Sequence, residues 1–206
     1  YFHDQWINRF DKDKTLEDTF YLLDGKEARI DFMNKTLGSA GFAKEKDFTR
    51  SSLGLKNGGQ MIFILPHQGV SPYELLSSPD EIERIFEEGE DDYGEVVWKI
   101  PKFSFDSKFK LKNYLKELGI KEAFNPNADF TGITDNMAYI SNIQQETYIS
   151  IDEEGVEASA FTQIDYVGSA QPEGRAEMIL NRPFIYGITA PNGNLLFIGI
   201  CSNPAE

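Results

Sequence analysis

Residue types that usually carry catalytic chemistry are scarce in this sequence. It contains one cysteine, Cys201, and two histidines, His3 and His67. A single cysteine cannot form a disulfide within the chain, and its place in the apolar run LLFIGIC predicts a buried structural thiol. The histidines and the cysteine lack the spacing of metal ligands, and the glycines form neither a phosphate-binding loop nor a dinucleotide fingerprint. We therefore expect no enzyme active site, no cofactor and no metal.

Positive charge is also in short supply. The 20 Lys and Arg residues stand against 34 Asp and Glu residues, which gives a net charge of −14. A surface this acidic repels phosphate backbones and anionic lipids, so we expect neither a nucleic-acid nor a membrane partner. The acidic run at 87–95 lacks the ligand spacing of a calcium loop and is typical of a solvated turn.

Long apolar runs are missing as well. The longest are MIFILP and LLFIGIC, and both are far too short to cross a bilayer. The sequence shows no signal-peptide pattern and does not begin with methionine, which favours a fragment or one piece of a processed protein.

Apolar and aromatic residues, in contrast, are plentiful. Hydrophobic residues make up 40% of the 206 residues and aromatic residues 13%, with 16 phenylalanines. This composition can bury a sizeable core and argues against disorder, and the length suits about one domain.

Strands dominate the predicted secondary structure, and helices are grouped in the middle of the chain. Period-two patterns and bounding Gly or Pro residues predict strands at 26–36, 47–55, 58–66, 94–109 with a break near Pro101, 143–151, 176–180, 184–190 and 194–201. Start signals and amphipathic spacing predict helices at 71–78, 78–89 and 110–120, the last ending at Gly119. This order indicates an α+β fold rather than repeated βαβ units.

The segment after the strand at 143–151 has an unusual pattern. Glu153, Glu154 and Gly155 form an acidic turn, and a run with small residues comes next at 156–165. With period two, one face of that run is small or apolar throughout, and both charges lie on the other face. Such a segment could slide between two strands without burying a charge. An edge strand followed by a long loop is the alternative interpretation of the same pattern.

Five stretches of this sequence resemble the serpin family. They are the F-x-x-x-W-x-x-x-F…T…F pattern of Phe2, Trp6, Phe10, Thr15 and Phe20, the IPKF segment at 98–120, the turn motif AFNPNADFTGIT at 123–134, the hinge-like IDEEGVEASA at 151–160 and the strands at 181–204. They cover essentially the whole chain in the family's order. Residues 1–206 are therefore identified as the C-terminal part of a single serpin domain, an α+β fold of three sheets with surrounding helices.

The resemblance implies a suicide inhibitor of serine proteases rather than an enzyme. In serpins a protease cleaves an exposed reactive loop, here about 154–176, and the cut loop then inserts as a strand of the main sheet. The implied partners are a target protease in a covalent acyl complex and the N-terminal remainder of the domain. A secreted protein, monomeric when complete, is also implied. A non-inhibitory carrier, chaperone or storage serpin is the alternative, and a binding domain that uses only the fold is a third interpretation. The small inserting face favours inhibition.

The resemblance also assigns the residues of the reactive loop. Its hinge would comprise Glu153, Gly155, Val156, Glu157, Ala158, Ser159 and Ala160. The family's spacing from Glu153 puts the reactive bond at Ser169–Ala170, with Gly168 as neighbour. The sequence YVGSA would suit an elastase-like or subtilisin-like protease. Arg175 would suit cleavage by a trypsin-like enzyme, but it lies six residues beyond Ser169.

Four residues correspond to positions that surround the loop in serpins. Trp6 resembles the tryptophan beneath the point where the loop inserts, in the breach region, and it also suits plain core packing. Lys102 and Glu153 resemble an ion pair at the same place, so we predict that they are neighbours. An exposed pair of this kind would contribute only about 0–1 kcal/mol. Gln145 stands in the shutter region where many serpins carry a histidine, so no histidine-like pH switch is expected there.

Overall fold

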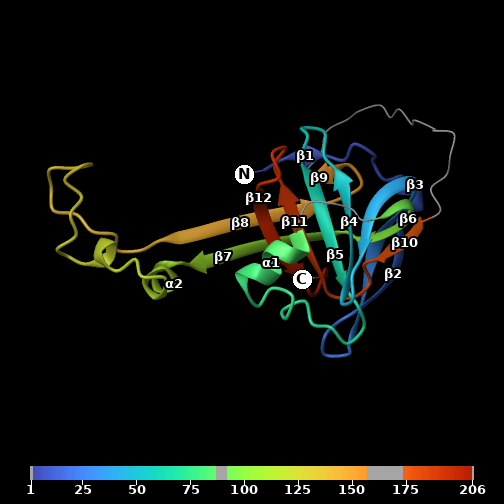
Figure 1. The fold of residues 1–206 in the computed structure, drawn as a ribbon, viewed down its shortest axis with the longest axis horizontal. Helices are drawn as coiled ribbons and strands as arrows, with labels where there is room; N and C mark the ends of the chain where they lie inside the picture. Colours follow the sequence, from blue (N-terminus) through green and yellow to red (C-terminus); the bar gives the residue numbers. More distant parts are fainter. Residues whose placement is uncertain (1, 87–91, 157–173, 206) are drawn as a thin grey trace. The chain divides into compact units, whose positions relative to one another are not determined.

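The computed structural model describes residues 2–86, 92–156 and 174–205 (Figure 1). Contacts within the chain divide it into two units. The larger unit comprises Phe2–Ser104 and Ser150–Glu206, and the smaller unit contains Phe105–Ile149.

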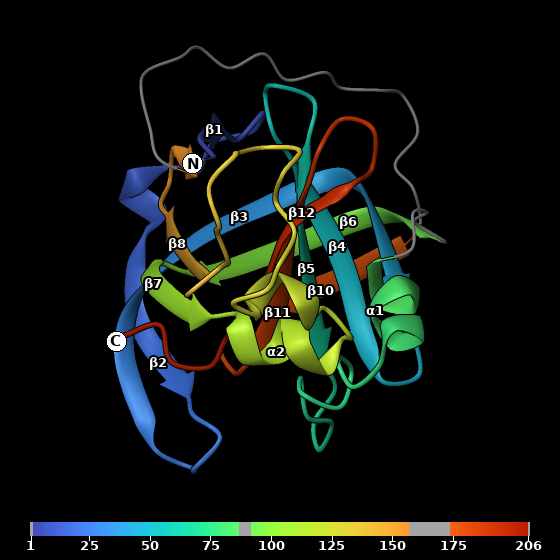
Figure 2. The ribbon, with the colours of Figure 1, turned by 90° about the vertical axis from the view of Figure 1, so that its left-hand side faces the viewer.

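An eight-stranded sheet forms the larger unit (Figure 2). Its strands are arranged in the order β10-β6-β3-β4-β5-β11-β12, and β2 also pairs with β3. The bounds are Leu16–Tyr21 for β2, Glu27–Lys44 for β3, Phe48–Gly54 for β4, Gln60–Pro66 for β5, Asp92–Pro101 for β6, Gly174–Ile179 for β10, Phe184–Thr189 for β11 and Leu195–Cys201 for β12. All these pairs are antiparallel except β10 with β6.

The core lies along the central strands of this sheet. Every residue of β11 is buried, which matches its largely apolar sequence. Phe63 of β5 packs edge-on against Trp98 of β6 and contacts Phe184 of β11, with ring centroids 5.5 and 6.1 Å apart. These aromatic contacts join strands that are far apart in the sequence.

Helix α1 (Pro79–Phe86) covers part of the sheet (Figure 2). Ser78 begins it, because its Oγ accepts a hydrogen bond from the Glu81 amide, and Pro79 suits the first helical position. Ile85 is fully buried against a cluster that contains Phe48, Ile64, Leu75 and Ile185. The polar face of the helix stays outside.

Two short strands of the larger unit pair with each other near the start of the chain. β1 (Asp4–Gln5) pairs antiparallel with β9 (Gly155–Val156), and the 3-10 helix η1 (Lys12–Lys14) comes after β1. These elements form the surroundings of the segment after residue 151.

The smaller unit is a two-stranded ribbon with a turn-rich end. β7 (Phe103–Lys110) pairs with β8 (Gln144–Ile151), and both strands continue into the larger unit at one end. Helix α2 (Lys112–Glu117) and the 3-10 helix η2 (Glu122–Phe124) lie between them in the chain. Gly119 ends the region of α2 with a positive φ of 97°, as predicted.

Most of the predicted strands are confirmed, but four points need correction. The segment 71–78 is a series of turns rather than a helix, with amide-to-carbonyl bonds between residues three apart, such as Glu74 to Ser71. Strand β2 was missed, because Phe20 is its only buried residue and the alternation is weak. β3 extends to Lys44, well beyond the predicted end at residue 36. The amphipathic spacing at 110–120 predicted a packed helix face, but Tyr114 of α2 and Leu118, which directly follows α2, are exposed.

Replacing Phe63 tests the aromatic core. In the full protein, we expect Phe63→Ala to lower the free energy of unfolding by about 3–5 kcal/mol, because it removes both ring contacts and leaves a cavity. Tyr21→Ala, at a half-exposed aromatic of β2, is the control and should change it by less than about 1 kcal/mol. Equal losses measured by chemical denaturation would contradict this placement of the core.

Candidate functional site

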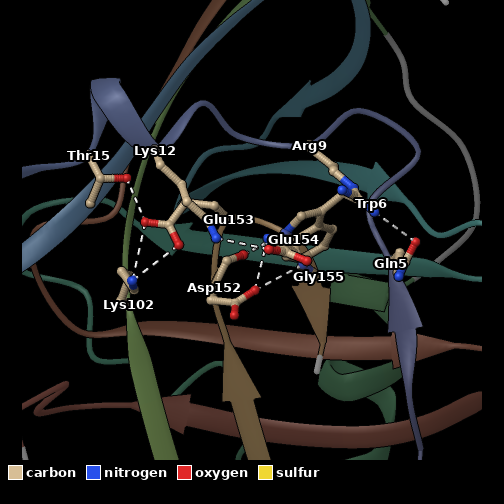
Figure 3. Close-up of polar contacts among 10 residues, drawn as sticks. All are labelled: Gln5, Trp6, Arg9, Lys12, Thr15, Lys102, Asp152, Glu153, Glu154 and Gly155. Atoms are coloured by element: carbon tan, nitrogen blue, oxygen red, sulfur yellow. Dashed lines mark hydrogen bonds and ion pairs between the residues drawn. The ribbon is translucent and has the colours of Figure 1, made fainter. Parts of the chain in front are cut away.

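The chain reverses direction immediately after β8. The Asp152 carboxylate oxygen Oδ1 accepts hydrogen bonds from the amides of Glu154 and Gly155, at 2.8 and 3.2 Å (Figure 3). The Asp152 amide donates to the Gly155 carbonyl at 3.2 Å. Asp side chains favour such turns because they replace a backbone acceptor. We call residues 152–155 the hinge turn.

Gly155 is required by the backbone packing of the hinge turn. It pairs with Gln5 in the β1–β9 ladder and has a φ of 152°. A Cβ atom at this position would lie 2.5 Å from both the Asp4 carbonyl oxygen and the Gln5 Cα. The prediction that Gly155 lets the chain turn here is consistent with this geometry.

Trp6 lies beneath the hinge turn and is fully buried. Its indole Nε1 donates to the Asp152 carbonyl at 2.9 Å, and its backbone amide donates to the Glu154 carbonyl at 3.2 Å. The ring also packs edge-on against Phe10, with centroids 6.2 Å apart. Trp6 therefore combines core packing with direct support of the hinge turn.

Glu153 places a carboxylate in a nearly closed environment. Its side chain is 5% exposed, and Lys102 Nζ lies 3.1 Å from its Oε2 (Figure 3). Thr15 Oγ1 donates to Oε1 at 2.8 Å. The prediction that Glu153 and Lys102 are neighbours is confirmed. Because Glu153 is buried, the small contribution to stability expected for an exposed ion pair does not apply to its pair with Lys102.

The pKa of Glu153 is set by opposing effects. Burial raises it, but hydrogen bonds from its own backbone amide, from Thr15 and from Lys102 together lower it below its ordinary value of 4.5. The carboxylate is therefore charged at neutral pH, and both partners donate to a charged acceptor. Such charge-assisted hydrogen bonds are stronger than neutral ones.

Glu154 is held by a second, more exposed ion pair. Lys12 Nζ of η1 lies 2.9 Å from Glu154 Oε1. The hydrogen bond raises the pKa of Lys12 and lowers that of Glu154. Both Thr15 and Lys12 were missed as partners of the hinge turn. Thr15 stands in the motif that resembles serpins, but nothing in the local pattern links Lys12 to residue 154.

The remaining predicted site residues are not brought into this cluster. Gln145 is exposed on β8, in the smaller unit. Arg175 lies in β10, opposite Glu95 of β6, and forms ion pairs with Glu95 and Glu177. The predicted hinge and reactive-bond residues beyond Val156 lie outside the described residues: Glu157, Ala158, Ser159, Ala160, Gly168, Ser169 and Ala170.

Other chemistry is not evident in the described parts of the chain. They contain no group of three or more His, Cys, Asp or Glu residues that could hold a metal ion. They also contain no helix long and apolar enough to span a membrane. Cys201 is fully buried, as predicted, and burial raises the pKa of its thiol.

Comparison with known proteins decides the family. The family model described as "Serpin (serine protease inhibitor)" matches residues 1–204. The chain belongs to the serpin family. Serpin-Z7 of Hordeum vulgare is 32% identical over 224 residues, which cover 100% of this chain and 54% of that relative. The chain thus spans about half the length of this relative, consistent with the C-terminal portion of a serpin domain.

Solved serpin structures share the fold. Serpin48, described as a highly specific serpin in the insect Tenebrio molitor, superimposes with a TM-score of 0.80 at 29% identity, covering 98% of this chain and 53% of that one. A thyroxine-binding globulin complex with thyroxine gives 0.82 at 24% identity, covering 100% and 55%, which shows the fold alone. The predicted α+β serpin fold is therefore confirmed.

Substitution of Gly155 tests the close packing at the hinge turn. We expect Gly155→Ala to destabilise the full serpin by about 1–3 kcal/mol, because the added Cβ overlaps the backbone of β1. Gly38→Ala in β3 is the matched control, since a Cβ there meets nothing within 4 Å. If thermal unfolding shows the two variants equally stable, the described packing of β9 against β1 is wrong.

The depressed pKa of Glu153 predicts a pH dependence. Stability from its charged form is present above the unfolded pKa and is lost as the pH falls through the lower folded pKa. The difference in Tm between the wild type and Glu153→Gln should therefore be largest at neutral pH and shrink below about pH 4.5. Glu74→Gln, at an exposed position, should follow the wild type throughout. A difference independent of pH would contradict a charged, hydrogen-bonded Glu153.

Proposed function

We propose that the serpin to which this chain belongs is a suicide inhibitor of serine proteases. The observation that carries the proposal is the anchored hinge turn, which directly precedes a segment with a small-residue face. Trp6, Lys12, Thr15 and Lys102 hold the hinge turn in place. A loop that must change from exposed chain to inserted strand needs such a fixed point at one end.

The proposed reaction begins as ordinary proteolysis. The catalytic serine of the protease would attack the carbonyl carbon of Ser169, and the bond to the nitrogen of Ala170 would break as that nitrogen takes up a proton. The product is an ester between the protease and Ser169. The segment after Gly155 would then insert as a new strand before water can hydrolyse the ester.

Insertion of this segment would bury only small or apolar side chains between strands. Val156, Ala158 and Ala160 share one face with period two, whereas Glu157 lies on the other. New backbone hydrogen bonds and burial would drive the insertion, so the uncleaved form would be kinetically trapped. The protease would be carried along and its active site distorted.

The position of Arg175 supports cleavage at Ser169. Arg175 pairs with Glu95 in the β10–β6 ladder and binds the carboxylates of Glu95 and Glu177. A protease needs its substrate segment free to extend into the active site, and a residue in a sheet ladder is not free. Ser169 and Ala170, with Gly168 before them, would suit a small S1 pocket such as that of elastase-like or subtilisin-like enzymes.

Localisation and assembly belong to the same proposal. As the resemblance implies, we expect the full protein to be secreted and monomeric, with the N-terminal part of the serpin domain as its structural partner. A carrier role is the alternative, since the thyroxine-binding globulin structure has the same fold at 24% identity. Such fold likeness does not specify function.

The direct test mixes the full protein with an elastase-type and a trypsin-type protease. We expect a complex with the elastase-type enzyme that survives denaturing electrophoresis, and a released peptide whose N-terminus is Ala170 by mass spectrometry. Ala158→Arg should abolish the complex and yield only cleaved protein, because it would bury a charge on the inserting face.

Ser159→Arg is the matched control, because the same charge then falls on the other face and the complex should persist. Cleavage of the wild type without a complex, and with no gain in Tm, would contradict inhibition and favour the carrier, chaperone or storage role.

A further inference from the structure

We propose that Asp152 is a positioning residue for loop insertion. Insertion needs a reversal of the chain after β8. The Asp152 carboxylate already forms this reversal before the protease cuts the loop. This inference rests on the proposed inhibitory function and concerns the rate of its conformational step.

The carboxylate, amide and carbonyl of Asp152 are all engaged in the hinge turn or its support. Oδ1 accepts from the amides of Glu154 and Gly155, the backbone amide donates to the Gly155 carbonyl, and the backbone carbonyl accepts from the Trp6 indole (Figure 3). Glu154 and Gly155 therefore have their amides directed at a side chain rather than at a neighbouring strand. The carboxylate takes the place that a backbone acceptor would have in a regular hairpin.

The hinge turn is also fixed to the body of the larger unit. Glu153 is bound by Thr15 and Lys102, and Glu154 by Lys12. The backbone carbonyls of Glu153 and Glu154 accept from the amides of Phe10 and Trp6, at 3.0 and 3.2 Å. Contacts from both sides therefore hold residues 152–155, and the hinge turn can act as a pivot that stays in place while the chain beyond it moves.

The inserted segment would run antiparallel to β8, from which it is separated only by the hinge turn. The hydrogen bond from the Asp152 amide to the Gly155 carbonyl has the pattern of the first rung of such a hairpin. Closing a turn costs conformational entropy, and here that cost has been met before cleavage. Insertion then extends an existing hairpin instead of nucleating one.

The rate of insertion decides the fate of the acyl-enzyme. Fast insertion traps the protease, whereas slow insertion lets water hydrolyse the ester and release an active enzyme. Loss of the Asp152 turn should therefore raise the number of inhibitor molecules consumed per protease inhibited. The rate of the initial cleavage should not change, because Asp152 is remote in sequence from the proposed reactive bond.

Four variants of the full protein separate turn geometry from charge. Asp152→Ala removes the acceptor, and Asp152→Glu keeps the charge but is one methylene too long to close the turn. Asp152→Asn loses the charge but keeps Oδ1 as an acceptor. Asp24→Ala is the control, since Asp24 Oδ1 accepts the Lys26 amide at 3.1 Å in the exposed turn between β2 and β3.

We expect Asp152→Ala and Asp152→Glu to slow insertion about five- to thirtyfold, because the carboxylate accepts two hydrogen bonds and the loss of each corresponds to about two- to fivefold. Insertion is followed by a fluorescent label on the loop after rapid mixing with the protease, and trapping by the stoichiometry of inhibition. Asp152→Asn and Asp24→Ala should match the wild type in both. If Asp152→Ala folds poorly, the comparison of Asp152→Glu with Asp152→Asn still tests whether turn geometry, rather than charge, sets the rate of insertion.

The outcomes distinguish the two proposals. Unchanged insertion in Asp152→Glu, or equal slowing in Asp152→Asn, would overturn the role of the turn while inhibition stands. If the wild type forms no covalent complex, the rise in Tm after cleavage of the loop is followed instead. If Tm rises more slowly in Asp152→Glu than in the wild type, the role of the Asp152 turn stands and inhibition is rejected. If Tm of the wild type does not rise, both proposals are rejected.

Discussion

A buried carboxylate that must remain charged organises the region around the hinge turn. Glu153 has 5% of its side chain exposed, and a charge in such surroundings needs hydrogen-bond donors on fixed elements. Thr15 provides one from 138 residues earlier in the chain, and Lys102 provides another from 51 residues earlier. These two contacts tie the segment after η1, the segment after β6 and the hinge turn to a single point.

The anchored hinge turn contrasts with the sequence beyond it. Up to Gly155, hydrogen bonds, ion pairs and close backbone packing fix the position of the chain. From Val156 onward the sequence provides small residues on one face and keeps charge on the other. In the proposed inhibitor these two properties are complementary, because a strand can be threaded quickly only from a fixed end and only with side chains that pass between its neighbours.

The other end of the loop is anchored by different means. Among the described strands, β10 lies at the edge of the sheet and pairs only with β6, and this is the single parallel pair that they form. At its start, Gly94 and Gly174 approach so closely that a Cβ on Gly94 would lie 1.9 Å from the Gly174 carbonyl oxygen. The start of β10 is held against β6 by close backbone contact and by the Arg175 ion pairs rather than by a buried charge.

Local sequence patterns determined much of this protein. The alternation at 143–151 predicted β8, and Gly155 and Gly119 predicted reversals of the chain, because strand period and glycine conformation depend on near neighbours. The ordered motifs predicted the serpin family. Only the tertiary structure decided that residues 71–78 form turns around the buried Leu75, that β2 exists, and that Lys12 and Thr15 bind the hinge acids. Those features depend on contacts between residues distant in the chain, and no periodicity within one segment encodes which remote side chain will meet it.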